Sequence, residues 1–195
     1  MPARPILNLL KSTNFALNAS KKFAFPRWKI IKNHIVGNKI LDFGLGMGSL
    51  AKCMLDDGYK VTGLDVDNTS LWQDIQPVIY DGKKIPYSND TFDNTTVICV
   101  LHHCQNQEKL LNEIMRVSKR AIVIEDTFRN QIEHISIAIR DSIENWEFYH
   151  HKYRSYPEWK SLCNNNGWKV KHIKSWSSWD FGILYGHQTC FVIEK

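Results

Sequence analysis

The stretch Ile40-Leu41-Asp42-Phe43-Gly44-Leu45-Gly46-Met47-Gly48 decides the fold of this 195-residue chain. It opens with a short apolar run typical of a buried strand and continues into a glycine-rich loop. Leu50, Cys53 and Met54 then have the spacing of one helical face. Glycines at alternate positions let a loop turn sharply and leave its backbone bare enough to press against a ligand. The stretch therefore predicts a strand, a ligand-binding loop and a helix, in that order.

The spacing of the glycines separates this loop from that of the dinucleotide-binding enzymes. Those enzymes favour GxGxxG, in which the following helix N-terminus receives a pyrophosphate. Here the loop reads GxGxG, and Asp42 lies two residues before the first glycine. A lone glycine loop is weak evidence for any ligand, so the features that follow it along the chain carry the argument.

Two carboxylates follow the loop, each at the end of an expected strand. Asp65 lies 21 residues after Gly44, where its oxygens can accept both hydroxyl groups of a ribose. Asp81 follows a third short strand, where the exocyclic amine of an adenine can donate to it, and Gly82 beside it permits close approach of the base. The loop and the two acids together predict an adenosine-containing ligand.

Apolar runs alternate with helix-length segments along the chain. We expect strands at 40–43, 59–64, 77–80, 95–101 and 121–124, and a helix at 110–117. A second helix carries Ile132, Ile135, Ile139 and Ile143 as one stripe, which we interpret as a packing face. A helix at 157–166 ends at Gly167, and strands at 170–176 and 188–193 complete the sheet.

This alternation predicts an α/β fold with helices on both faces of the sheet. Specifically, we expect a Rossmann-like, doubly wound, mostly parallel seven-stranded sheet with an antiparallel edge strand. We expect a basic helical segment or lid at 1–38 and a single domain at 39–195. The segment between the second and third strands is short, so it has little room for the helix usual there.

With these motifs in order, the sequence resembles the class I S-adenosylmethionine-dependent methyltransferases, particularly the branch that includes the ubiquinone and menaquinone C-methyltransferases. Members of that family show Asp-x-Gly-x-Gly-x-Gly after a strand, as in Asp42 to Gly48 here. The resemblance covers roughly residues 39–124. Its further motifs are Gly63-Leu64-Asp65, Asp81-Gly82 with Ile85-Pro86, Phe92-Asp93, Val100-Leu101-His102-His103 and Leu111-Asn112-Glu113-Ile114-Met115-Arg116-Val117.

The resemblance implies a role for each motif. In that family the glycine loop holds the methionine part of S-adenosylmethionine, the second-strand acid binds the ribose and the third-strand acid binds the adenine. The cofactor site expected here consists of Asp42, Gly44, Gly46, Gly48, Asp65, Val66, Asp81, Gly82 and Val100.

Two histidines at the end of the fourth strand are the candidate catalytic residues. A sulfonium is already an excellent leaving group, so methyl transfer needs positioning and, for some acceptors, removal of a proton. His102 and His103 are the bases best placed by sequence, although the family commonly has a packing histidine there. Glu125 and Asp126, after the fifth strand, could polarise the acceptor, but holding helix termini is the stronger reading.

We expect no metal site in the chain. His102-His103-Cys104 resembles a metal cluster, but adjacent residues at a strand end point in different directions. The five cysteines include no CxxC pair, so neither a zinc site nor a disulfide framework is indicated.

Charge and composition indicate which classes of partner the chain could bind. Residues 1–41 hold eight Lys or Arg and no acid, a stretch that could face anionic lipid, nucleic acid, an acidic substrate or solvent. No apolar run approaches the ~20 residues of a membrane span, so we expect a cytoplasmic protein, with peripheral membrane contact left open.

A small-molecule acceptor is the favoured partner, because Trp146 to Tyr185 holds eleven of the 23 aromatic residues, dense enough for a flat or apolar acceptor. His150, His151 and Tyr153 lie in this region as further substrate-facing candidates. A nucleic-acid or protein methyltransferase and a non-catalytic S-adenosylmethionine-binding module are the alternatives. The sequence leaves the oligomeric state undecided.

Overall fold

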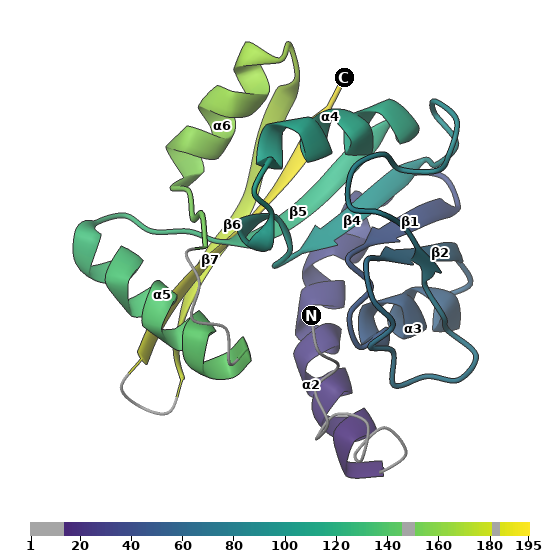
Figure 1. Ribbon diagram of the computed structural model, residues 1–195, viewed down its shortest axis with the longest axis horizontal. Coiled ribbons are helices and arrows are strands. Elements are labelled where there is room, and N and C mark those ends of the chain that lie inside the picture. Colours follow the sequence, from purple (N-terminus) through teal and green to yellow (C-terminus); the bar gives the residue numbers. More distant parts are fainter. Residues whose placement is uncertain (1–13, 146–150, 181–183) are drawn as a thin grey trace. The chain divides into compact units, whose positions relative to one another are not determined.

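The computed structural model describes residues 14–145, 151–180 and 184–195 (Figure 1). The chain divides into two compact units. The first consists of Met1–Thr96 with Arg116–Lys119, and the second of Val97–Met115 with Arg120–Lys195. Among the described helices, none is long and apolar enough to cross a membrane.

The first unit carries the glycine-rich loop between a strand and a helix, as predicted. Strands β1 and β2 pair in parallel, with Ile40 opposite Val61, and β2 pairs in parallel with the two-residue β3. The described residues between β2 and β3 form no helix. The elements are α2 (Asn14–Ile31), the 3-10 helix η1 (Lys32–His34), β1 (Lys39–Phe43), α3 (Ser49–Asp56), β2 (Lys60–Asp65), β3 (Val78–Ile79) and the start of β4 (Asn94–Ile98).

Helix α2 packs beside α3 within this unit (Figure 1). Its buried residues Ser20, Ala24, Trp28 and Ile31 follow a helical spacing that places them on one face. The Trp28 indole donates to an Asp57 carboxylate oxygen 2.8 Å away, which fixes the helix at the end of α3. The exposed residues of α2 include Lys21, Lys22 and Lys29 together with Phe23 and Phe25.

The second unit ends in a long antiparallel pairing. Strand β7 pairs antiparallel with β5 on one side and with β6 on the other. Ser155 begins α6 with a capping box: its hydroxyl accepts from the Glu158 amide, while the Glu158 carboxylate accepts from the Ser155 amide. The elements are the 3-10 helix η2 (Leu101–His103), α4 (Gln107–Val117), β5 (Arg120–Asp126), α5 (Gln131–Asn145), α6 (Tyr156–Asn165), β6 (Lys169–Asp180) and β7 (Leu184–Glu194).

The strand order is β3-β2-β1-β4-β5-β7-β6. This seven-stranded, mostly parallel sheet with antiparallel pairing toward one edge confirms the predicted fold class. The antiparallel strand, β7, lies one place in from the edge, and β6 forms the edge itself. Gly167 ends α6 with a φ of 79°, as its position predicts.

The fourth strand is shorter than predicted. The sequence indicates a strand to Leu101, but β4 ends at Ile98, and Cys99 then takes a φ of 55°, rare for a residue with a side chain. The next two amides, of Val100 and Leu101, donate to the Glu125 side chain instead of to a backbone carbonyl group. The strand therefore ends three residues earlier than predicted, and η2 begins at Leu101.

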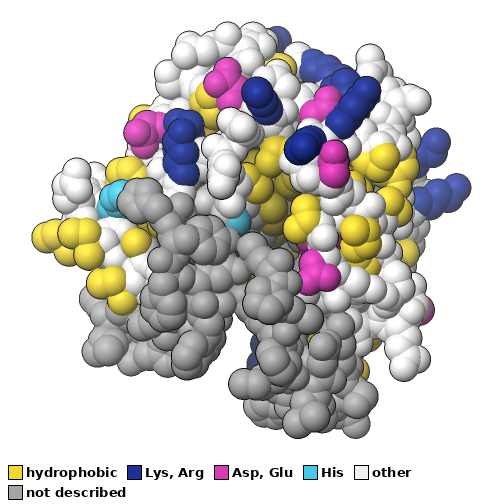
Figure 2. Space-filling view, in the orientation of Figure 1, with side chains coloured by type: hydrophobic (Ala, Val, Ile, Leu, Met, Phe, Trp, Pro, Cys, Tyr) yellow, Lys and Arg dark blue, Asp and Glu magenta, His cyan; other side chains and the backbone are white. Residues whose placement is uncertain are grey.

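The isoleucine stripe of α5 does not pack, which corrects the prediction. Ile132, Ile135 and Ile139 are 81%, 57% and 47% exposed, and Figure 2 shows apolar side chains on the surface over α5 at the left of the view. The side chain of Ile143 lies outside the described residues. The buried face of the helix is mostly polar instead, because Glu133, Arg140 and Asp141 find charged or hydrogen-bonding partners there. Apolar periodicity alone therefore gave the wrong face.

Candidate functional site: a glycine-loop site and a histidine network

The glycine-rich loop adopts a conformation that its glycines alone make easy. Gly44, Gly46 and Gly48 have φ of 74°, 51° and 75°, in the left-handed region, and α3 begins directly after them. Among the described residues, a Cβ added to Gly46 would meet only the Gly44 carbonyl oxygen, 3.9 Å away. The backbone at Gly46 is therefore bare and faces open space, as close approach of a ligand requires.

Asp65 is held directly against this loop. One of its carboxylate oxygens accepts the Gly46 amide at 2.9 Å, and the other accepts the Val66 amide at 2.7 Å. A carboxylate has about four acceptor positions, so both oxygens retain capacity for a ligand's hydroxyl groups. Residues 19 positions apart in the sequence thus meet at one point.

Asp81 and Gly82 lie beside the same strand end. The Tyr80 amide donates to the Asp65 carbonyl oxygen at 3.1 Å, and a Cβ on Gly82 would lie 3.5 Å from a methyl group of Val66. The exposed Asp81 carboxylate accepts the amides of Lys83 and Lys84, which lower its pKa and keep it ionised.

Asp42, near the end of β1, is buried, unlike Asp65 and Asp81. Its carboxylate accepts the Thr96 hydroxyl at 2.7 Å. Burial and the charge of Asp65 raise its pKa to about 7, although the Thr96 hydrogen bond opposes the rise. We call this set the glycine-loop site: Asp42, Gly44, Gly46, Gly48, Asp65, Val66, Asp81 and Gly82.

The donor set fits an adenosyl ligand with an amino-acid tail. Its bare backbone at Gly46 and its two carboxylates, Asp65 and Asp81, match the bare loop, the ribose acceptor and the adenine acceptor that the sequence predicts. Val100, the ninth predicted residue, belongs to the second unit, where its amide donates to Glu125 at 2.9 Å.

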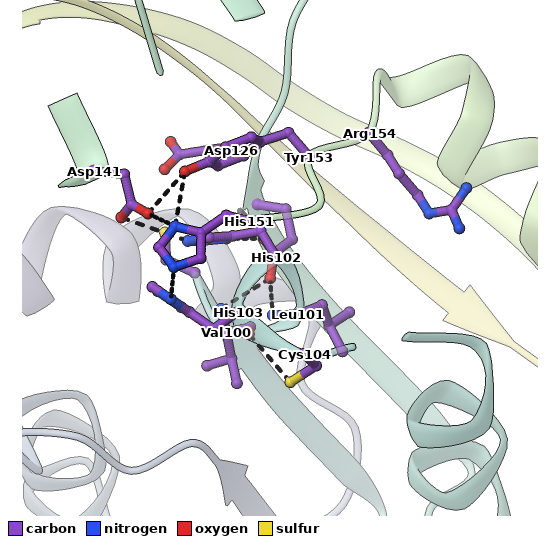
Figure 3. Close-up of polar contacts among 12 residues, drawn as sticks. Val100, Leu101, His102, His103, Cys104, Asp126, Asp141, His151, Tyr153 and Arg154 are labelled. Carbon is purple, nitrogen blue, oxygen red and sulfur yellow. Dashed lines mark hydrogen bonds and ion pairs between the residues drawn. The ribbon is translucent and has the colours of Figure 1, made fainter. Parts of the chain in front are cut away.

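The second unit holds a cluster of ionisable side chains, which we call the histidine network (Figure 3). It brings together residues from η2, β5, α5 and the segment before α6. Its members are His102, His103, Glu125, Asp141, His151 and Tyr153.

Glu125 anchors the network to the backbone. One of its oxygens accepts the amides of Val100 and Leu101 at 2.9 and 2.7 Å, and the other contacts Nδ1 of His102 at 2.6 Å. The residue is fully buried. Its contact with the start of η2 agrees with the reading that it holds a helix terminus.

His102 lies between two carboxylates. Its Nδ1 faces Glu125, and its Nε2 lies 3.7 Å from Asp141, while its ring stacks on Tyr153. Burial alone would lower the pKa of His102, but the charge of Glu125 and the contacts with Asp141 and Glu125 raise it to about 10. His102 is therefore a fixed positive charge.

The pKa of His103 is shifted in the opposite direction from that of His102. His103 is partly exposed, and its Nδ1 lies 3.3 Å from Nε2 of His151. Burial, and then the charge of His102, lower the pKa of His103 to about 4. His103 is a neutral imidazole at neutral pH, so of the two predicted histidines it is the one able to accept a proton.

Asp141 joins the histidines from α5. It pairs with Nδ1 of His151 and accepts the Tyr153 hydroxyl at 2.7 Å. Burial alone would raise the pKa of Asp141, but the ion pair with His102 and the hydrogen bond from Tyr153 hold it below its ordinary value. The same carboxylate raises the pKa of Tyr153, as burial does.

The reason for expecting no metal was partly wrong. The rings of His102 and His103 do not diverge: their centroids are 4.2 Å apart, because both lie in the 3-10 turn and not on a strand. One nitrogen of each and an Asp141 oxygen lie within 4.8 Å of one another. Both nitrogens of His102 face carboxylates, however, so protonation satisfies it. The expectation of no metal now rests on this pairing.

Sequence reasoning found some members of the network and missed others. His151 and Tyr153 were weak candidates, and Asp141 was missed because nothing in the α5 pattern distinguishes it. His150, Trp146 and Tyr149 lie outside the described residues. Asp126 pairs with Arg140 at 2.7 Å, and Trp159 is buried against Phe191, so both have structural roles.

Comparisons with known proteins find similarity to methyltransferases. Residues 41–122 match the sequence model of a family described as "Methyltransferase domain". An uncharacterised methyltransferase of Bacillus licheniformis is 31% identical over 123 residues, 56% of each chain. Demethylmenaquinone methyltransferase of Paenarthrobacter aurescens is 29% identical over 90 residues, 43% of this chain and 36% of the relative. The chain thus matches about half or less of these relatives.

A solved structure extends the likeness in fold to nearly the whole chain. Magnesium protoporphyrin IX methyltransferase of Synechocystis PCC 6803, solved with bound SAH, has a TM-score of 0.61 at 13% identity. The match covers 97% of this chain and 98% of that one. The chain is therefore similar to methyltransferases in sequence over residues 41–122 and in fold over nearly its whole length. The resemblance drawn from the sequence is confirmed.

Proposed function

We propose that the chain transfers a methyl group from S-adenosylmethionine to a flat or apolar small molecule. The observation that carries the proposal is the bare Gly46 backbone beside the Asp65 carboxylate, with the Asp81 carboxylate following the next strand. These groups would hold the methionine part, the ribose and the adenine respectively. Val66 and Gly82 would complete the contacts, and Asp42 would support the loop at the end of β1.

The bound cofactor supplies a methyl group on a sulfonium, an excellent leaving group. The protein's own residues therefore need to bind and orient the acceptor and, where its attacking atom carries a proton, to take that proton. His103 is the candidate for this task because it is neutral and partly exposed. His102 is charged and buried, so its role would be to orient its neighbours.

Ring contacts support a flat acceptor. Phe128 lies 4.6 Å from His134, and His134 lies 5.9 Å from Tyr153, measured between ring centroids. Phe128, His134 and His103 are each partly exposed. Aromatic rings that retain an exposed edge or face can pack on another ring, which favours a planar ligand.

Calorimetric titration with S-adenosylmethionine, S-adenosylhomocysteine and NAD tests the cofactor step. Binding of both adenosyl ligands and not of NAD is expected. Asp65→Ala should weaken binding by about 1–3 kcal/mol because the ribose loses its acceptors. Asp74→Ala, which removes an exposed acid elsewhere in the first unit, is the matched control and should bind normally. Unchanged affinity in Asp65→Ala would show that the ribose lies elsewhere.

Action on nucleic acid is the second candidate, favoured by the outer face of α2. This face exposes Lys21, Lys22 and Lys29 together with Phe23 and Phe25, and the helix contains no acid. Such a face suits a polyanion, whose binding weakens steeply with salt. RNA binding measured at two salt concentrations separates the candidates, because a small-molecule enzyme needs no salt-dependent affinity for RNA.

A further inference from the structure

We propose that Asp141, His151 and His103 form a proton relay in which His103 is the catalytic base and the other two residues position it. The relay would serve an acceptor whose attacking oxygen or carbon carries a proton. This inference rests on the proposed methyl transfer and narrows its substrate class.

The relay is a continuous chain of contacts (Figure 3). Asp141 pairs with Nδ1 of His151, and Nε2 of His151 lies 3.3 Å from Nδ1 of His103. The inner two members are buried, whereas His103 is partly exposed. The chain therefore runs from a buried carboxylate toward a partly exposed imidazole.

Hydrogen-bond accounting assigns the proton positions. The Tyr153 hydroxyl donates to Asp141, so Asp141 is a carboxylate and Nδ1 of His151 must carry the proton that it receives. In the proposed relay, Nε2 of His151 is the acceptor of this contact and Nδ1–H of His103 is the donor. This leaves the lone pair of His103 on Nε2, the atom that would take the acceptor's proton.

The surrounding charges explain why His103 needs the relay. Among the described residues, the charged or titratable groups that act on the pKa of His103 are His102 from η2, Asp126 from β5, Asp141 from α5 and His151 from the segment before α6. The positive charge of His102 makes a proton on His103 unfavourable. Passing the proton to His151 would place the charge beside the Asp141 carboxylate, where it is stabilised.

The proposed step balances as follows. The attacking atom of the acceptor forms a bond to the methyl carbon, the carbon–sulfur bond breaks, and its electron pair stays on sulfur. The acceptor's proton passes to Nε2 of His103. The proton on Nδ1 of His103 then moves to Nε2 of His151, leaving one added proton in the network, to be released to solvent.

This chemistry selects an acceptor class. A thiol ionises near neutral pH and gains little from a base, whereas a phenolic hydroxyl group or an acidic carbon keeps its proton. A relay of three residues is of use only to the second group. We therefore infer a phenol, an enol or a comparably acidic carbon as the acceptor.

Imidazole nitrogen NMR of the full chain is the first test. We expect His103 and His151 both protonated on Nδ1, His103 titrating near pH 4, and His102 carrying two protons through neutral pH. Asp141→Asn should change the tautomer populations of His151 and His103. The matched control His172→Gln, which removes an exposed histidine of β6, should leave them unchanged. A proton on Nε2 of His103 in the wild-type chain would overturn the relay.

Paired probes test the catalytic part, with His151→Gln as the variant. Naphthol and naphthalenethiol share shape and differ in the acidity of the attacking group. His151→Gln should lower kcat for naphthol by about 10- to 100-fold and leave the thiol nearly unaffected. Equal losses for both probes, or none for either, would refute the relay.

Failure of the proposed function and failure of the relay give different experimental results. Absence of S-adenosylmethionine binding in the calorimetric titration would sink the proposed function, whatever the tautomers. Cofactor binding without turnover of either probe would count against a flat acceptor, and the NMR tautomers alone would then decide the relay.

Discussion

The glycine-loop site and the histidine network are built from different parts of the chain. The loop site uses backbone amides and three acids that follow one another between residues 42 and 82. The network uses side chains from four segments, joined by hydrogen bonds and ion pairs between residues up to 48 positions apart. A site made of backbone can be read from short motifs, because conformation and spacing define it. A site made of distant side chains depends on packing.

The largest expected effect is on the free energy of unfolding, through the Arg140–Asp126 ion pair beside the network. In β7, a Cβ on Gly186 would lie 1.6 Å from Nη1 of Arg140, whose guanidinium pairs with buried Asp126. Gly186→Ala should therefore break that pair and cost about 3–5 kcal/mol in the free energy of unfolding, measured in urea.

Gly58→Ala gives the contrast for this prediction. Its Cβ would meet no atom within 4 Å, but its φ is 87°, so only backbone strain is added. The expected cost is about 1–2 kcal/mol. Equal costs for the two variants would mean that Arg140 moves aside without penalty.

The second effect concerns the buried acid of the loop site. The pKa of Asp42 is raised to about 7, so the folded state binds a proton between about pH 4 and pH 7 that the unfolded state has lost. Stability should fall as the pH rises through this range. Asp42→Asn removes the effect and keeps an acceptor for Thr96. We expect a gain of about 2–4 kcal/mol at pH 8 and none at pH 3, measured by urea unfolding.

His103 should give the free energy of unfolding the opposite pH dependence. The pKa of His103 is lowered to about 4, so between pH 6.5 and pH 4 the unfolded chain takes up a proton that the folded chain does not. This contribution to stability is lost as the pH falls. His103→Gln should therefore lose less stability than the wild type between pH 7 and pH 4, by about 1–2 kcal/mol. Parallel pH curves for the two proteins would contradict the lowered pKa.

The smallest effect tests a local feature beside the network. Ser155→Ala removes the capping box of α6 and should cost about 1 kcal/mol of unfolding free energy. The His103 and His151 tautomers should stay unchanged, because Ser155 makes none of their contacts. A shift in either tautomer would show that the α6 cap holds the network in place.

Much of the fold followed from the sequence. The β1 strand, the loop glycines, α3 and the parallel β2 were predicted because glycine conformation and apolar periodicity are local properties. Asp65 was predicted beside the loop, since parallel strands end at one edge of the sheet. The structure adds the Gly46 amide as its partner.

The α5 helix shows where local pattern misleads. The sequence predicts its isoleucines as the packing face, but they are exposed, and Glu133, Arg140 and Asp141 are buried instead. A polar residue can occupy an interior position when a partner satisfies it, and those partners lie in other elements. No spacing rule within α5 identifies Tyr153 or Asp126 as such partners.

The sequence by itself determined the α/β fold and the conformation of the glycine-rich loop, because these depend on backbone conformation and on order along the chain. Tertiary structure alone decided which histidine is charged. His102 and His103 are adjacent and chemically identical, yet one lies between Glu125 and Asp141 and the other beside His151. Burial and neighbouring charge set their pKa values in opposite directions, and both come from residues that folding brings together.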